Sequence, residues 1–227
     1  VPSVGMRADG VTASASAGAA VPVPEEIETY EACSGGPRAV APEWITFGNG
    51  AADLIYRLMQ VLRPQQVVVA APAFAEYSVA AERVGAQVVP VYLSEADDFS
   101  FTPAVEAAFI QAIERAPSGS AVFLCNPNNP TGRTAQPELL REIVRKCTEN
   151  GVKLVVDECF NDFLTDAERH TRKDLLESNP GLIILRAYTK MYAVPGVRFG
   201  WCMTADAALI EKLYHAGQPW NVSVIAQ

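Results

Sequence analysis

A lysine with a nearby arginine is the first group in this sequence that could do covalent chemistry. Lys190 lies among Tyr188, Met191 and Tyr192, and Arg198 follows shortly after it. Apolar surroundings would strip water from the lysine amine, lower its pKa and suit it to Schiff-base formation. A single lysine is nevertheless most often a solvated surface residue. Lys190 is therefore a candidate only together with other groups.

Two adjacent carboxylates form the second group. Asp157 and Glu158 directly follow a buried-type run that ends at Val155 and Val156. An unpaired carboxylate at the edge of a core is costly. We therefore expect Asp157 to face a cation, which could be a metal ion, an arginine or a protonated ring nitrogen. Helix capping is the alternative.

Two loops complete the set. The turn Gly48-Asn49-Gly50 leads into a helix at Ala51 and Ala52, and free backbone N–H groups at a helix start favour phosphate. The segment Cys125–Gly132 carries Asn126, Asn128 and Asn129 between prolines, which suits ligand contact at a strand end. A plain turn is the alternative for both loops.

The elements that must position these residues alternate along the chain. Apolar periodicity, proline and glycine boundaries predict strands and helices in the following ranges. The strands are Val67–Ala71, Gln87–Leu93, Ala121–Cys125, Lys153–Asp157, Leu182–Arg186 and Arg198–Met203, and the helices are Ala51–Leu62, Tyr77–Val84, Thr102–Arg115 and Pro137–Asn150. This order predicts an α/β three-layer sandwich with a mostly parallel central sheet. Ligands bind such sheets at the carboxyl ends of the strands, where the residues above stand.

Composition narrows the function classes. With 26 acidic against 18 basic side chains the net charge is −8, which argues against nucleic acid and anionic membranes as partners. No apolar run is long enough to span a membrane. The five cysteines are scattered and accompany only two histidines, which predicts free thiols in the cytoplasm and no metal site.

The first part of the chain reads differently from the rest. Residues 1–42 are rich in small residues and proline and show no apolar periodicity. We expect an irregular N-terminal arm, with at most a short helix near Pro24–Cys33. The remaining residues 43–227 form the expected domain.

The five motifs in combination resemble a known family. GNGAADLI, PAFAEY, NPNNPTG, VVDECF and YTKMYAVPGVRFG occur in this order. They are similar to the class I/II aminotransferases of the fold-type-I pyridoxal-phosphate superfamily, in the branch of histidinol-phosphate aminotransferase and threonine-phosphate decarboxylase. The resemblance covers about Trp44 to Gln227.

The resemblance implies roles at matched positions. The cofactor would be pyridoxal 5'-phosphate, held by Lys190 as a Schiff base, and Lys190 would also shuttle a proton. Asp157 would keep the ring nitrogen protonated. The remaining cofactor-binding positions are Asn129 at the phenolic oxygen, Phe74 on the ring face, and Thr189, Arg198 and the backbone of Ala51 and Ala52 at the phosphate.

Three departures from the family pattern bear on the reaction. Phe160 stands where many aminotransferases have a tyrosine, and Ala187 stands where relatives often have a serine or threonine at the phosphate. The C-terminal small domain, whose arginine grips the substrate carboxylate, is not recognisable. We therefore expect residues 43–227 to be the cofactor-binding large domain without that small domain.

The implied activity is transfer of an amino group between an L-amino acid, phosphorylated or not, and a 2-oxo acid. One alternative is a threonine-phosphate decarboxylase-like enzyme of cobalamin biosynthesis, towards which Phe160 leans. Another is a truncated, non-catalytic cofactor-binding domain. A homodimer is expected because sites of this family lie at a dimer interface, and Trp220 is a candidate for that surface.

Overall fold

The computed structural model describes residues 40–225 of the chain. Its strands are β1 (Ile45–Asn49), β2 (Gln66–Ala71), β3 (Gln87–Tyr92), β4 (Ala121–Cys125), β5 (Lys153–Asp157), β6 (Leu182–Ala187) and β7 (Phe199–Met203). Its α-helices are α2 (Gly50–Leu62), α3 (Glu76–Arg83), α4 (Pro103–Arg115), α5 (Pro137–Glu149), α6 (Ala167–His170) and α7 (Ala207–Ala216). Short 3₁₀ turns are η1 (Pro42–Trp44), η2 (Glu95–Asp97), η3 (Asn161–Phe163) and η4 (Lys173–Leu175).

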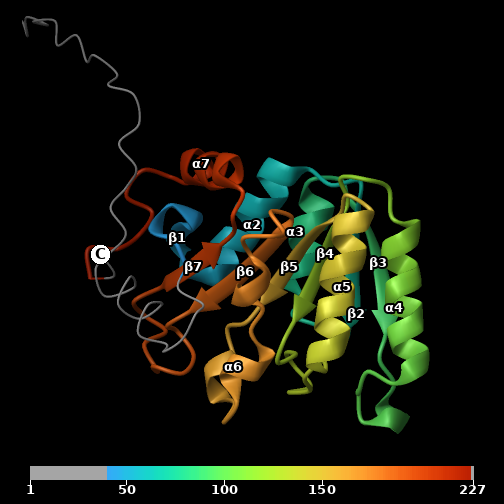
Figure 1. Cartoon of the computed structure of the whole chain (residues 1–227). Coiled ribbons are helices and arrows are strands. Elements are labelled where there is room, and N and C mark those ends of the chain that lie inside the picture. The colour runs from blue at the N-terminus through green and yellow to red at the C-terminus, as the bar shows by residue number, and fades with distance from the viewer. Residues whose placement is uncertain (1–39, 226–227) are drawn as a thin grey trace, which may run out of the picture.

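In residues 40–225 all strands form one sheet in the order β1-β7-β6-β5-β4-β2-β3 (Figure 1). The neighbouring strands β3, β2, β4, β5 and β6 are parallel to one another, whereas β7 is antiparallel to both β6 and β1. Because β7 is antiparallel to both of these neighbours, β1 runs in the same direction as β6. The carboxyl ends of β1, β4, β5 and β6 therefore lie along the same edge of the sheet.

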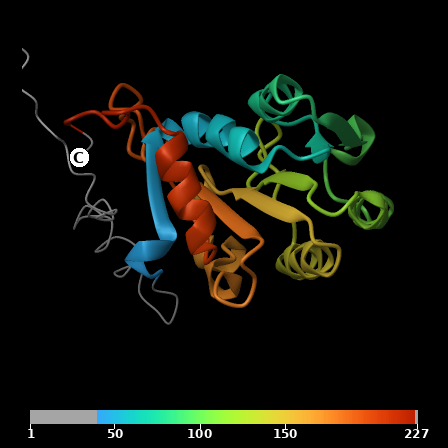
Figure 2. The ribbon, with the colours of Figure 1, turned by 90° about the horizontal axis from the view of Figure 1, so that it is seen from above.

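Alternating side chains of the strands supply two cores, one on each face of the sheet. Val68 and Val122 belong to the core that packs under α4 and α5. Val67 and Phe123 belong to the core under α2, α3 and α7. Figure 2 shows α2 and α3 on one side of the sheet and α5 on the other. The predicted three-layer α/β sandwich is confirmed.

Most predicted elements agree with the structure to within a residue or two at either end. Thr102 caps α4 as expected, since its hydroxyl accepts from the N–H of Val105 at 3.4 Å. The elements expected from the sequence do not include β1, α6 and α7. Strand β7 begins at Phe199, so Arg198 precedes it with a left-handed φ of 57°.

Two expectations concern residues that the structure does not describe. The predicted arm of residues 1–42 lies outside residues 40–225 except for its last three positions, and the helix expected near Pro24–Cys33 lies outside them entirely.

Among the described cysteines, Cys125, Cys147, Cys159 and Cys202 are free and buried. In the described part of the chain no helix is both long and apolar enough to cross a membrane.

Candidate active site

A cavity of about 200 Å³ opens at the carboxyl edge of the sheet, on the face that α2 and α3 cover. All eight positions assigned from the sequence line it: Ala51, Ala52, Phe74, Asn129, Asp157, Thr189, Lys190 and Arg198. They come from the start of α2, from loops after β2 and β4, from the end of β5 and from the loop between β6 and β7. The sheet topology thus brings together side chains that are far apart in the sequence.

One end of the cavity holds a buried carboxylate. Asp157 is 5% exposed, and its Oδ2 accepts a 2.7 Å hydrogen bond from the Tyr77 hydroxyl. Its Oδ1 accepts from the backbone N–H of Cys159 at 3.0 Å. The alternative of helix capping is wrong, because the next helical turn, η3, begins at Asn161 and has Phe160 as its N-cap.

The groups around Asp157 are held neutral. Burial, and then the charge of Asp157, raise the pKa of Tyr77 well above its usual value. The same two causes raise the pKa of Cys125 to about 12 and that of Cys159 well above the ordinary thiol range. The carboxylate is therefore surrounded by protonated hydroxyl and thiol groups, which leaves its negative charge available to a cation in the cavity.

Aromatic rings shape the wall beside this carboxylate. Tyr77 stacks on Phe123 with ring centres 4.7 Å apart, and Phe74 meets Tyr77 edge-on at 5.6 Å. Phe74 lies in the loop just before α3, and the backbone N–H of Tyr77 donates to the carbonyl of Phe74 at 3.3 Å, so a single turn places both rings at the same wall. Tyr77 was not among the residues predicted for the site, although its position three residues after Phe74 could have indicated it.

The opposite end of the cavity is suited to an anion. The first turn of α2 presents backbone N–H groups there, and such groups have no partner within the helix. Thr189 and Arg198 line the same end. Gly50 has a φ of 77°, a left-handed conformation that favours glycine, and a Cβ at this position would lie 2.6 Å from Nη2 of Arg198 and would displace the end of that side chain.

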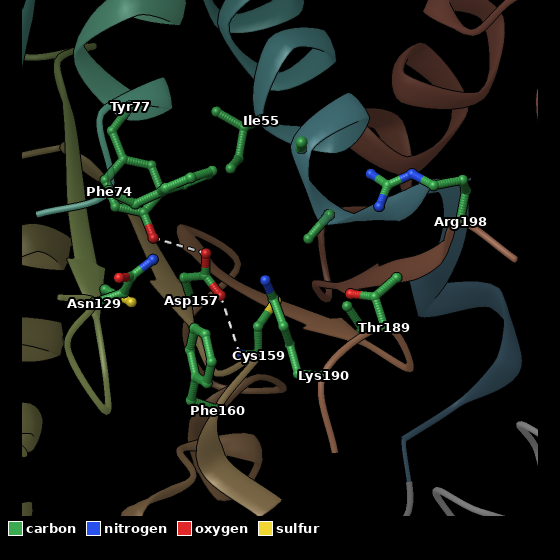
Figure 3. A pocket seen from close by; sticks show the side chains of 14 residues that line it. Ile55, Phe74, Tyr77, Asn129, Asp157, Cys159, Phe160, Thr189, Lys190 and Arg198 are labelled. Atoms are coloured by element: carbon green, nitrogen blue, oxygen red, sulfur yellow. Dashed lines mark hydrogen bonds between the residues drawn. The ribbon is translucent and has the colours of Figure 1, made fainter. Parts of the chain in front are cut away.

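Lys190 lies between the two ends. Figure 3 shows its amine pointing into the cavity, with Asp157 on one side and Thr189 and Arg198 on the other. Nζ is 5.2 Å from the centre of the Phe160 ring. The expected burial of Lys190 is wrong: the lysine is exposed, as are Met191 and Tyr192, because the loop between β6 and β7 stands out from the sheet.

The three asparagines after β4 have different tasks. Asn128 donates to the carbonyl of Pro72 at 3.0 Å and to the hydroxyl of Thr131, and Asn126 accepts from the N–H of Ala135 at 2.8 Å. These two amides hold the loop together. Only Asn129 faces the cavity.

Further lining residues were not assigned from the sequence as binding positions. They are Ile55, Tyr77, Cys125, Cys159, Phe160 and Ala187. Cys125 and Asp157 are register partners at the ends of β4 and β5, so strand parity places Cys125 on the cavity face. Parity could have identified this residue from the sequence once the pairing of the two strands was known.

The chain matches a known protein family over most of its length. The model of the family described as aminotransferase class I and II matches residues 37–227. The chain belongs to this family. Its enzymes use pyridoxal 5'-phosphate, and the donor set fits this cofactor: a buried carboxylate for the ring nitrogen, an amide for the phenolic oxygen, and a helix start with a cation for the phosphate.

Individual relatives carry two kinds of name. The chain is 33% identical over 187 residues to the threonine-phosphate decarboxylase of Salmonella typhimurium, covering 82% of this chain and 49% of that protein. It is 31% identical over 190 residues to histidinol-phosphate aminotransferase 1 of Cupriavidus pinatubonensis, covering 83% and 48%. The chain thus spans about half the length of the curated relatives it matches.

The fold is shared with solved enzymes of the family. The crystal structure of histidinol-phosphate aminotransferase from Clostridium acetobutylicum superposes with a TM-score of 0.71 at 28% identity, covering 81% of this chain and 52% of that one. The described residues therefore correspond to part of a fold-type-I aminotransferase, as the motifs indicated.

Proposed function

We propose that this chain binds pyridoxal 5'-phosphate through Lys190 and uses it to transfer an amino group between an L-amino acid, phosphorylated or not, and a 2-oxo acid. The observation that supports the proposal most is the position of Lys190 in one cavity between a buried carboxylate and an anion-binding end. When bound, the cofactor supplies an aldehyde that condenses with amines and a ring that withdraws electrons from the substrate Cα.

The residues of the chain divide the remaining work. Asp157, oriented by Tyr77 and the N–H of Cys159, holds a proton on the ring nitrogen by its negative charge. Asn129 donates to the phenolic oxygen, and Phe74 covers one face of the ring. The Nζ atom of Lys190 takes up the proton that leaves the substrate Cα and returns it.

The phosphate needs a local positive site, and this otherwise acidic chain has one where Arg198 meets the start of α2. Arg198, Thr189 and the backbone N–H groups of Ala51 and Ala52 bind the phosphate in this proposal. Ala187 lines the same cavity but has no hydroxyl group. The backbone N–H groups and the Arg198 guanidinium therefore make most of the phosphate contacts in this proposal.

Decarboxylation of L-threonine O-3-phosphate is the second candidate. Two observations favour it: 33% identity to the Salmonella typhimurium decarboxylase, and Phe160 in the cavity wall, where a tyrosine hydroxyl is absent. Both reactions use the same electron withdrawal at Cα, but they break different bonds.

The cofactor assignment is tested by covalent capture. The chain is incubated with pyridoxal 5'-phosphate, reduced with borohydride and digested, and the modified lysine is located by mass spectrometry. We expect the label on Lys190 and its loss in Lys190→Ala. Lys212→Ala, at an exposed position of α7, is the matched control and should retain the label on Lys190. Labelling of other lysines only would overturn the assignment.

The reaction is tested with two substrates. Transamination predicts formation of 2-oxoglutarate from L-glutamate without release of carbon dioxide. Release of carbon dioxide from L-threonine O-3-phosphate, without formation of a 2-oxo acid from glutamate, would replace it with the decarboxylase. Neither product, together with a labelled Lys190, would establish a cofactor-binding domain without catalysis of its own.

We also propose that two copies of the protein pair in the cytoplasm. Large apolar side chains stand exposed in the segments after β6 and after α7, with Trp220 94% exposed, accompanied by Met191, Tyr192, Val194, Val224 and Ile225. The two segments that carry them are joined by a hydrogen bond from the Ser223 hydroxyl to the carbonyl of Val197 at 3.3 Å. Exposed apolar patches of this kind are typical of interfaces. Sedimentation analysis should give a dimer that Trp220→Ser weakens, and a monomer in the unaltered chain would contradict it.

A further inference from the structure

Arg57, in the second turn of α2, is the buried centre of a polar cluster next to the cavity. The residue is 5% exposed. Nη1 donates to the carbonyl of Leu213 in α7 at 3.1 Å, and Nη2 donates to the carbonyl of Phe47 in β1 at 2.8 Å. Nε donates to Oδ2 of Asp53 at 2.9 Å, and Nη2 contacts the same oxygen. One guanidinium thus connects α2 with the elements on either side of it.

Asp53 extends this cluster to the start of α2. Its Oδ2 accepts from the backbone N–H of Asn49 at 3.2 Å and from Nδ2 of Asn221 at 2.8 Å. The side chain of Asn49 makes no capping hydrogen bond of its own. The carboxylate of Asp53 therefore holds the residue that precedes the helix, while Arg57 holds the carboxylate.

Glycine residues lie close against this cluster. A Cβ on Gly48 would lie 2.7 Å from Oδ2 of Asp53, and a Cβ on Gly217 would lie 2.6 Å from Nη1 of Arg57. On the other side of the helix start, a Cβ on Gly200 would lie 2.4 Å from the backbone nitrogen of Ala51. The first turn of α2 is therefore packed between β7 and the Arg57 cluster.

The position of the first turn of α2 matters because the anion-binding end of the cavity has few side-chain donors. Ala51, Ala52 and Ala187 line it without hydroxyl groups. Arg198 is exposed and approaches the carbonyl of Asn49 at 3.5 Å, so its position also depends on the start of α2. The direction of the backbone N–H groups then decides how well a phosphate is bound.

We propose that Arg57, acting through Asp53, is a positioning residue that fixes the first turn of α2 and thereby sets the affinity of the site for the cofactor phosphate. The inference rests on the proposed function, because it assumes that pyridoxal 5'-phosphate occupies the cavity. Arg57 touches no part of the cofactor in this account. Its effect is confined to the phosphate end, which separates it from a general contribution to folding.

The test compares two ligands on one variant. Arg57→Lys keeps the positive charge, but a single ammonium group cannot reach Asp53, Phe47 and Leu213 together. We expect the dissociation constant of pyridoxal 5'-phosphate to rise about tenfold, equivalent to ~1.4 kcal/mol. The dissociation constant of pyridoxal, which lacks the phosphate, should stay unchanged. Both are measured by titration of the full chain.

Arg145→Lys is the matched control. Arg145 also forms two ion pairs on a helix, with Glu142 and Glu149 of α5, but on the opposite side of the sheet from the cavity. The affinities for both ligands should equal those of the unaltered chain. A phosphate-specific loss in this control would show that the effect does not belong to the Arg57 cluster, and would overturn the proposal.

A second variant reaches Arg57 from outside the cavity. Gly217→Ala places a methyl group against Nη1 of Arg57 and should produce the same selective loss of pyridoxal 5'-phosphate affinity. Unchanged affinity in both variants, or equal weakening of both ligands, would overturn the proposal. If the unaltered chain binds pyridoxal and pyridoxal 5'-phosphate equally, the positioning role is wrong while the proposed lysine stands. If it binds neither, the proposed function fails as well.

Discussion

The Tyr77 hydroxyl donates a 2.7 Å hydrogen bond to Oδ2 of Asp157 across 80 positions of sequence. Helix α3 brings the donor and strand β5 brings the acceptor, and both groups are buried. The bond fixes the orientation of the carboxylate that faces the cavity. Removal of the Tyr77 hydroxyl should therefore act on the orientation of Asp157, while the ring that lines the cavity is kept.

Tyr77→Phe removes this donor and keeps the ring that stacks on Phe123. A buried carboxylate that loses one of its donors costs about 1.5–3 kcal/mol. We expect the free energy of unfolding in urea at neutral pH to fall by that amount. Phe74→Leu, which also alters the aromatic wall but leaves the Asp157 hydrogen bond intact, is the comparison. An unchanged stability of Tyr77→Phe would show that Asp157 gains another donor.

Glu158→Gln should be among the most destabilising single changes. Glu158 is fully buried, accepts from Nη2 of Arg186 at 2.9 Å and accepts from the Thr171 hydroxyl at 2.8 Å. The substitution removes the buried counter-charge of Arg186, while its contact with Asp162 remains. Breaking one side of a buried pair costs about 3–5 kcal/mol. Chemical unfolding measures the loss.

The double variant of this pair discriminates charge from packing. Glu158→Met combined with Arg186→Met removes both charges and keeps apolar volume, which is often close to neutral. We expect it to be more stable than Glu158→Gln alone. A double variant that is the less stable of the two would mean that the hydrogen bonds to Thr171 and its neighbours, not the charge balance, dominate.

Gly200→Ala tests the close contact between β7 and the start of α2. The new Cβ would lie 2.4 Å from the backbone nitrogen of Ala51, so the helix start must move away. Overpacking of this kind costs about 1–3 kcal/mol. We expect a lower melting temperature and weaker binding of pyridoxal 5'-phosphate. Gly196→Ala is the control, because nothing lies within 4 Å of a Cβ there.

Alkaline pH should destabilise the protein through its buried thiols. Burial raises the pKa of Cys147 to about 12. An unfolded thiol has a pKa of about 8.5, so above that pH the unfolded state binds fewer protons than the folded state. The stabilisation is complete below pH ~8.5 and is lost as pH rises towards 12. Cys147→Ala should reduce the slope of unfolding free energy against pH by ~1.4 kcal/mol per unit between pH ~9 and ~11. An unchanged slope would contradict the buried, protonated thiol.

Helices and strands were predicted best where their own residues indicate the element, through a cap, a turn residue or an apolar run. The helix at Pro103–Arg115 has a threonine cap and a proline in its first turn, and the central strands have β-branched runs bounded by turn residues. β1 was missed because Ile45–Asn49 contains Gly48 and Asn49, which are weak strand formers. Only pairing with β7 makes this segment a strand. α7 has a modest apolar pattern and depends on packing against α2.

Motif order in the sequence determined the family, the cofactor and the eight positions that line one cavity. These depend on residue identity along the chain. The tertiary structure alone decided that Asn126 and Asn128 serve the loop, that Lys190 is exposed and that Tyr77 orients Asp157. It also placed the buried Arg57 guanidinium against Asp53 in the first turn of α2. The reason is physical: burial and hydrogen-bond partners across the sheet depend on which strands and helices become neighbours, and sequence spacing does not contain those distances.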